Sequence, residues 1–259
     1  MINDTINPAA EPLSGAWASP FHAGKRVLVT GGTSGIGAAI ARGFLEAGAD
    51  VWSTGVSEEE VAAAAGDPAL ARANGAVLDV RDGESVRTFI GSLPELDVVV
   101  NCAGIIRRNA ELDPATFESV VDVNLNGAMR VCASARPLLA RSGGSIVNLA
   151  SMLSFFGGGS VPGYSASKGG IAQLTKSLAI AYAADRIRVN AIAPGWISTP
   201  LTKALRDDDT RSAAILGRTP LGRWGDPADL VGGVLYLCSP AAAFVTGAIL
   251  VIDGGYAVT

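Results

Sequence analysis

The chain has 259 residues, of which 49% are hydrophobic and 17% are charged. It is long enough to bury a substantial core, either as one large α/β domain or as two small ones. The formal net charge of −4 argues against a nucleic-acid or anionic-membrane partner, because both require clustered Lys and Arg. No stretch reaches the roughly 20 apolar residues that a membrane-spanning helix needs.

Cysteine and histidine usage restricts the chemistry further. Cys102, Cys132 and Cys238 fall inside apolar segments without metal-ligand spacing, which predicts buried free thiols and a cytoplasmic location. His22 is the sole histidine, which removes most zinc sites and histidine-based triads from consideration. We therefore expect no metal.

The first residues differ in composition from the rest. Residues 1–23 are rich in Pro, Ala and Ser and lack the basic start and apolar core of a signal peptide. We expect them to form a flexible or partner-docked arm, with ordered structure beginning at Lys25. The interior shows no linker or repeat, so residues 24–259 are predicted to form a single domain.

A strand predicted at residues 26–30 leads into a glycine-rich turn and then into a helix that stops at Gly48. This order places backbone N–H groups and the positive end of a helix beside a diphosphate, with glycine where the backbone must approach closely. The spacing Gly-x3-Gly-x-Gly departs from the usual dinucleotide fingerprint, and such turns also serve as connectors. The candidate ligands are Gly31, Thr33, Ser34, Gly35, Ile36 and Gly37.

Further strands are predicted at residues 50–54, 76–80, 96–100, 145–150, 186–192 and 248–252. Helical patterns lie between them at residues 58–65, at 114–139, from Pro162 onward and at 227–238. This alternation predicts an α/β fold: one doubly wound, parallel, seven-stranded sheet with helices on both faces. Residues 198–225 combine charges with short apolar runs, which favours a mobile lid over a core helix.

Two polar residues stand out along these elements. Asp79, at the end of the third strand, can accept a hydrogen bond from an exocyclic amine or cap a helix. Asn124 falls on an apolar face of the long helix, and a buried amide must be hydrogen-bonded. It therefore either ties down backbone or holds an ordered water.

The most informative spacing is Tyr164-x3-Lys168, thirteen residues after Ser151. In a helix that begins near Pro162, residues four apart lie on one face and meet the same bound molecule. A nearby ammonium favours the phenolate and lowers the pKa of a tyrosine from about 10, as a general acid/base requires. Taken alone, the pattern is also that of a helix surface pair.

Together these motifs resemble the short-chain dehydrogenase/reductase family over nearly the whole span from Lys25 to Tyr256. The family's order and spacing are matched by residues 30–37, 101–104, Asn124, Ser151, Tyr164, Lys168 and 194–195. The family's usual second asparagine is Cys102 here, at a position that serves mostly through its backbone. The competing possibility is a non-catalytic nucleotide sensor or scaffold on the same fold.

The resemblance implies a role for each residue of the set. Tyr164 acts as general acid/base, Lys168 lowers its pKa and holds the nicotinamide ribose, Ser151 steadies the substrate oxygen, and Asn124 anchors a proton-relay water. Beyond the glycine-rich turn, it implies cofactor contacts at Gly55, Asp79, Val80, Asn101, Ala103, Gly104, Tyr164, Lys168, Pro194, Gly195, Ile197 and Thr199.

Residues 101–108, 150–155 and 222–225 resemble the 2-dehydro-3-deoxy-D-gluconate 5-dehydrogenases and gluconate 5-dehydrogenases. The alternative is a 3-oxoacyl-[acyl-carrier-protein] reductase, which shares the catalytic motifs. Arg107 and Arg108 are predicted to select a carboxylate, since arginine pairs with that group bidentately. Otherwise they are solvated or pair with Glu111 or Asp113. Ser151, Met152 and Tyr164 complete the substrate candidates.

The cofactor and the assembly are predicted less directly. At the end of the second strand stand Gly55 and Val56, with neither an acid for the ribose 2′-hydroxyl nor a base for a 2′-phosphate. Ser34 replaces the arginine common in NADP enzymes of the family, so we predict NAD over NADP. The resemblance implies a homotetramer or dimer, built through the helices after Gly104 and Tyr164 and the last strand.

Overall fold

The computed structural model describes residues 14–259. The strands are β1 (Arg26–Thr30), β2 (Asp50–Gly55), β3 (Asn74–Val77), β4 (Val98–Asn101), β5 (Ser145–Leu149), β6 (Arg188–Pro194) and β7 (Ile249–Ile252). The helices are α1 (Ser19–His22), α2 (Gly35–Glu46), α3 (Glu58–Ala65), α4 (Gly83–Ser92), α5 (Pro114–Val121), α6 (Ala128–Ser142), α7 (Pro162–Ala181), α8 (Lys203–Arg206), α9 (Asp209–Gly217) and α10 (Val231–Cys238).

The strands form one parallel seven-stranded sheet in the order β3-β2-β1-β4-β5-β6-β7, as the sequence predicts. Thr30 at the end of β1 pairs with Thr54 of β2 on one side and with Asn101 of β4 on the other. The strand order reverses there, and open α/β sheets bind ligands at the carboxyl ends of such neighbouring strands. The topology thus places the candidate site beyond β1 and β4.

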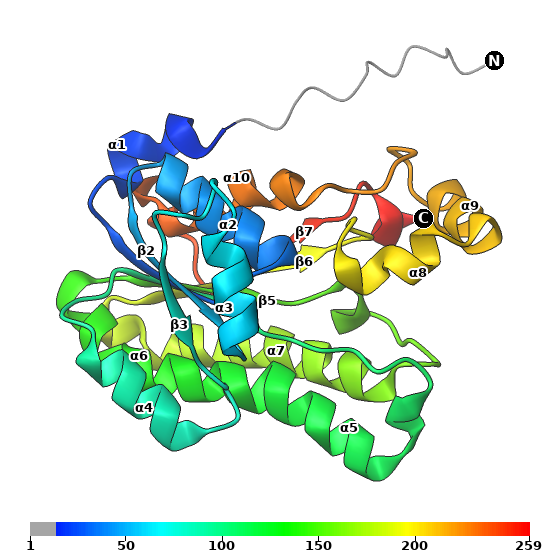
Figure 1. Ribbon diagram of the computed structural model, residues 1–259, viewed down its shortest axis with the longest axis horizontal. Coiled ribbons are helices and arrows are strands. Elements are labelled where there is room, and N and C mark those ends of the chain that lie inside the picture. Colours follow the sequence, from blue (N-terminus) through cyan, green and yellow to red (C-terminus); the bar gives the residue numbers. More distant parts are fainter. Residues whose placement is uncertain (1–13) are drawn as a thin grey trace.

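Helices cover both faces of the sheet, with α2 and α10 on one side and α4 to α7 on the other (Figure 1). The residues of β1 alternate between the two cores. Val27 and Val29 pack with α2 and α10, whereas Leu28 packs with α4 and α6. Because a central parallel strand is buried on both faces, three consecutive residues of β1 are apolar, and this run made the strand recognisable in the sequence.

The expected start of ordered structure at Lys25 is wrong. A 3-10 turn (Gly15–Ala18) and α1 pack against α2 and α10, and Ala18 and His22 are buried. The ring of His22 is hydrogen-bonded to the carbonyl of Leu235. Residues 1–13 of the predicted arm lie outside the described part.

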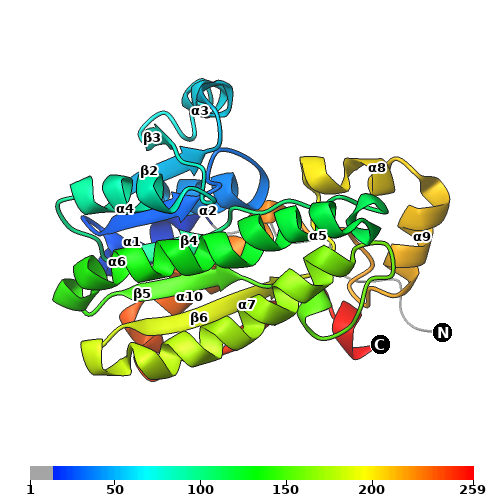
Figure 2. The same ribbon diagram turned by 90° about the horizontal axis from the view of Figure 1, so that it is seen from below.

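Other boundaries also differ from prediction. The third strand ends at Val77, so Asp79 and Val80 follow it. The predicted long helix consists of α5, a π-helical segment (Asp122–Gly127) and α6. In the predicted lid, α8 and α9 project from the end of the molecule where the chain terminates (Figure 1, Figure 2).

Candidate functional site

A cavity of about 500 Å³ lies at the carboxyl ends of β1 and β4. Segments that are far apart in the sequence line it: the glycine-rich turn, residues 78–81, residues 102–105, Arg107, the Tyr164/Lys168 face of α7, and residues 199–201. The structure therefore brings the predicted cofactor turn and the predicted acid/base pair into one cleft.

The glycine-rich turn fits an anionic group. Gly31 has a φ of +63°, and a Cβ there would lie 2.7 Å from the Cα of Ala103. A Cβ on Gly37 would lie 2.1 Å from the carbonyl oxygen of Gly31. Ser34, the N-cap of α2, makes no side-chain capping bond, so the first N–H groups of α2 remain available to a diphosphate. These residues fit a dinucleotide.

Asp79 and Arg81 lie at the other end of the cleft as a bound pair. The guanidinium of Arg81 donates to both carboxylate oxygens of Asp79, with its Nη2 at 2.6 Å from Oδ2. This hydrogen bond lowers the pKa of Asp79. Asp79 Oδ1 also accepts from the backbone N–H of Arg81 at 2.9 Å, so the aspartate closes a local turn. Its remaining lone pairs can accept from an amine, and the charge of Arg81 is neutralised.

Lys168 lies on the same face of α7 as Tyr164, one turn later, because the helix begins at Pro162 as predicted. Its Nζ lies 5.5 Å from the centroid of the Tyr164 ring and donates to the carbonyl of Leu149 at 2.6 Å. Burial lowers the pKa of Lys168 to about 8, so the ammonium form predominates at neutral pH.

The pKa of Tyr164 moves upward, contrary to the lowering expected from Lys168. Burial is the largest cause, because it penalises the phenolate. The Ser151 hydroxyl and the charge of Arg108 act in the opposite direction, while Glu111 adds to the rise. In the protein without ligands, burial thus outweighs the nearby positive charges.

Asn124 lies in the π-helical segment and is 2% exposed. Its Oδ1 accepts from the N–H of Ile105 at 2.8 Å, and its Nδ2 donates to the carbonyl of Ile105 and to Ser167 Oγ. Of the two predicted roles, these contacts show the backbone tie. π-helical turns inside α-helices often occur at functional sites, and here the turn directs an amide toward the cleft-lining segment.

Glu111, predicted from the sequence only as a possible partner of an arginine side chain, has another role in the structure. This carboxylate is 1% exposed and accepts from two backbone N–H groups at 2.7 Å, Arg107 through Oε1 and Tyr164 through Oε2. Val161, the N-cap of α7, supplies no side-chain cap. Glu111 therefore caps α7, the helix that carries Tyr164 and Lys168, and fixes the Arg107 loop to it.

Replacing Glu111 with Ala is expected to lower the free energy of unfolding by about 3 kcal/mol, because two buried N–H groups lose a charged acceptor. Glu111→Gln should lose less, since one amide oxygen can still accept. Glu118→Ala, on an exposed face of α5, is the matched control and should stay within about 0.5 kcal/mol. Urea unfolding at fixed protein concentration checks this. Equal stability of all three variants would remove the capping role.

Arg107 and Arg108 diverge in the structure. Arg107 is exposed and lines the cleft, and its guanidinium donates to the carbonyl of Ile106. Arg108 is half-buried and donates to the carbonyl of Leu201 at 3.3 Å. Within residues 14–259 neither guanidinium forms an ion pair, so both keep their charge available to an anionic substrate.

Some predicted site residues do not line this cavity. The amide of Asn101 donates to Asn148 Oδ1 and Cys132 Sγ in the core. Gly195 lies against Asp253, since a Cβ there would be 2.6 Å from the Asp253 Cα. The cavity lining also does not include Asn124, Arg108, Ser151, Met152, Pro194 and Ile197.

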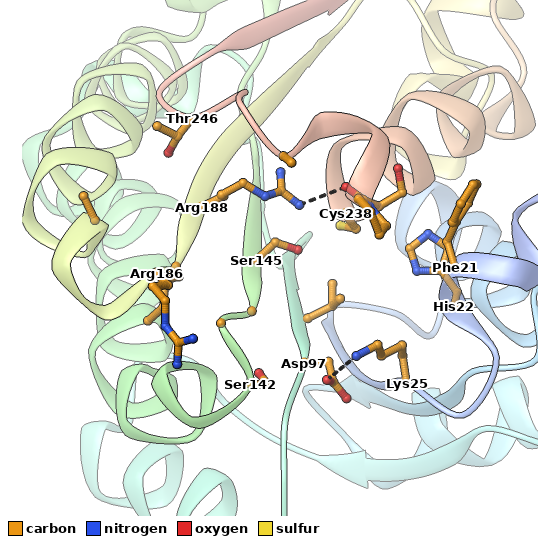
Figure 3. Close-up of a pocket in the computed structure, with 18 residues that line it drawn as sticks. Phe21, His22, Lys25, Asp97, Ser142, Ser145, Arg186, Arg188, Cys238 and Thr246 are labelled. Carbon is orange, nitrogen blue, oxygen red and sulfur yellow. Dashed lines mark hydrogen bonds and ion pairs between the residues drawn. The ribbon is translucent and has the colours of Figure 1, made fainter.

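A second cavity, of about 550 Å³, lies at the amino ends of the strands (Figure 3). Helix carboxyl termini point there, and Arg188 donates to the carbonyls of Leu237 and Ser239 at the end of α10. This guanidinium thus caps a helix.

In the described part of the chain, no helix is long and apolar enough to cross a membrane, and no group of three or more His, Cys, Asp or Glu could hold a metal.

Known proteins are similar to this chain in sequence. Residues 31–257 match the sequence profile of a family described as Enoyl-(Acyl carrier protein) reductase. A 2-dehydro-3-deoxy-D-gluconate 5-dehydrogenase of Pseudoalteromonas atlantica is 44% identical over 90% of this chain and 96% of its own length. A 3-oxoacyl-[acyl-carrier-protein] reductase of Chlamydia pneumoniae is 39% identical over 90% of this chain and 96% of its own length.

A solved structure extends the similarity to three dimensions. The gluconate 5-dehydrogenase of Burkholderia cenocepacia, in complex with NADP and tartrate, superposes with a TM-score of 0.86 at 35% identity, covering 92% of this chain and 96% of that one. Fold, motifs and relatives agree. The chain belongs to the short-chain dehydrogenase/reductase family and is an NAD(P)-dependent dehydrogenase acting on CH–OH groups.

Proposed function

We propose that this enzyme interconverts a secondary alcohol and a ketone on a small sugar acid, in the manner of a 2-dehydro-3-deoxy-D-gluconate 5-dehydrogenase. The observation that carries the proposal is the meeting of Tyr164 and Lys168 in a cleft that Arg107 also lines, with the charge of Arg108 acting on Tyr164. Neither arginine has a carboxylate partner in the described residues. The first pair supports the reaction class, and the arginines support an acidic substrate.

In the proposed reaction, the Tyr164 hydroxyl gives its proton to the ketone oxygen as alkoxide charge develops, and takes it back in the oxidation. The nicotinamide, when bound, supplies or accepts the hydride. Lys168 keeps a positive charge near the phenol and holds the ribose, and Ser151 steadies the substrate oxygen. Asn124 anchors a relay water through Oδ1, which accepts from the N–H of Ile105 with one lone pair and has a second lone pair for the water.

For the cofactor, we propose NAD. Ser34, Gly55 and Val56 provide no cation for a 2′-phosphate at the turn or at the end of β2. The proposed contacts are the predicted residues that line the cleft, from the glycine-rich turn through Gly55, Asp79, Val80, Ala103 and Gly104 to Thr199. Residues 198–225 serve as the lid over the substrate side.

The competing function is reduction of a 3-oxoacyl group on an acyl carrier protein, which the Chlamydia pneumoniae relative supports. An acidic carrier would need basic groups outside the cleft. The experiment compares rates on a keto-sugar acid with rates on a 3-oxoacyl-carrier thioester at equal enzyme concentration. We expect turnover of the sugar acid, whereas faster reduction of the thioester would favour the competitor.

We also propose a cytoplasmic homotetramer. The three cysteines are unpaired, which suits a reducing compartment. Strand β7 is an edge of the sheet, and its Val251 is 40% exposed. Two further large apolar side chains are exposed, Ile180 near the end of α7 by 81% and Phe244, which precedes β7, by 104%. Such a surface on a sheet edge needs a cover.

Light scattering after size exclusion is expected to give four times the chain mass for the wild type. Ile180→Glu and Phe244→Glu should shift the assembly toward smaller species, because each places a charge in an apolar interface. Arg87→Glu, at an exposed position of α4 and away from the proposed interface elements, is the control for a surface charge change. A wild-type monomer at micromolar concentration would contradict the proposed assembly.

A further inference from the structure

A carboxylate lies beside the end of β2, and it belongs to Glu60 of α3. Glu60 lines the cleft, and its Oε2 accepts from the N–H of Val56 at 3.0 Å and from Thr33 Oγ1 at 3.5 Å. Val56 directly follows β2, and Thr33 belongs to the glycine-rich turn. The acid thus occupies the corner between the first two strands.

The local sequence explains how a helix residue reaches this corner. Ser57 is the N-cap of α3, and its Oγ accepts from the N–H of Glu60, as in a capping box. The carboxylate, however, reaches past the N-cap to Val56. Gly55 leaves the space for it, because a Cβ there would lie 2.9 Å from Glu60 Oε2. From the sequence alone, Ser-x-x-Glu indicates only a helix cap.

The negative charge of the Glu60 carboxylate has no ion-pair partner among the described residues. Arg81, one of the cations that line the cleft, is held by Asp79. Both hydrogen bonds to Glu60 end on Oε2, and no donor of the described residues is hydrogen-bonded to Oε1. A sugar hydroxyl can donate to that oxygen, whereas a phosphate dianion in the same place meets a like charge.

We propose that Glu60 binds the 2′-hydroxyl of the adenosine ribose and makes this enzyme select NAD over NADP. The inference rests on the proposed function, and it assigns to α3 a task that an acid at the end of the second strand performs in other dinucleotide-binding folds. It also separates this chain from the Burkholderia cenocepacia relative, which was solved with NADP.

Calorimetric titration of NAD⁺ and NADP⁺ into the purified enzyme tests the proposal without any substrate. The wild type should bind NAD⁺ at least about tenfold more tightly than NADP⁺, since a charged hydrogen bond is replaced by repulsion. Glu60→Gln keeps the shape and the contact with Val56 but removes the charge. It should reduce the preference by about tenfold or more, mostly through tighter NADP⁺ binding.

Glu59→Gln, an exposed neighbour on the same helix turn, is the matched control and should keep the wild-type ratio. An unchanged ratio in Glu60→Gln, with NAD⁺ still bound, would overturn the role of Glu60 and leave the proposed function standing. Wild-type preference for NADP⁺ would overturn it as well. Failure of the wild type to bind either dinucleotide would refute both.

Discussion

Tyr164→Phe is expected to lower kcat by about 10²- to 10⁴-fold, because the variant loses the hydroxyl that transfers the proton. The ring stays, so its position beside the Lys168 ammonium should persist. Cofactor affinity should therefore change little. The measurement is steady-state turnover with a keto-sugar acid, together with dinucleotide binding by calorimetry.

Tyr182→Phe provides the matched control. This tyrosine follows α7, stacks with the Arg136 guanidinium at 4.6 Å and lies far from the cleft lining. The same loss of one hydroxyl there should leave turnover near the wild-type value. If Tyr164→Phe retained activity within a few-fold, Tyr164 would not be the acid/base.

The second large effect concerns the two arginines of the 105–108 loop. If one of them pairs with the substrate carboxylate, its replacement by Ala should reduce kcat/KM for the acid by about 10- to 100-fold, because a charge-assisted hydrogen bond contributes about 1.5–3 kcal/mol. The uncharged counterpart of the substrate should react almost as before. Rates on both substrates, for Arg107→Ala and Arg108→Ala, check this.

The surroundings of the two side chains separate their effects. Arg108 lowers the pKa of Tyr164, so Arg108→Ala should shift the basic limb of the pH profile upward for both substrates. Arg107→Ala should leave that profile in place. Equal losses of kcat/KM on acidic and neutral substrates would mean that the arginine has a structural role. No loss in either variant would show that neither arginine binds the substrate carboxylate.

Local patterns predicted much of this molecule. The apolar runs of β1 and β5 and the proline at the start of α7 each act within a few residues. Parallel order followed from the alternation of strands and helices. Tyr164 and Lys168 could be paired because one helix turn joins them.

Contacts between distant segments could not be predicted in the same way. Glu111 caps α7 across more than fifty residues, and no local pattern distinguishes it from a solvated acid. Glu60 was hidden behind an ordinary capping sequence. The π-helical turn at Asn124 depends on packing that the helical period does not encode.

Two elements were missed in the sequence although their signals are local. Helix α4 was not predicted, yet it follows the cap residue Asp82 and places Val86 and Ile90 one turn apart in the core. The segment before Lys25 contains Pro and Ala without a clear period, yet its few apolar contacts with α2 and α10 suffice to order it.

The most direct test of the account is a turnover experiment with the wild-type enzyme, reduced dinucleotide and 2-dehydro-3-deoxy-D-gluconate-type keto acids, with identification of the product. We expect one molecule of cofactor to be oxidised for each ketone carbon that becomes a CH–OH group, and a faster reaction with the acid than with its neutral counterpart. Binding of the reduced dinucleotide without its oxidation by any of the keto-sugar acids would contradict the proposed redox function.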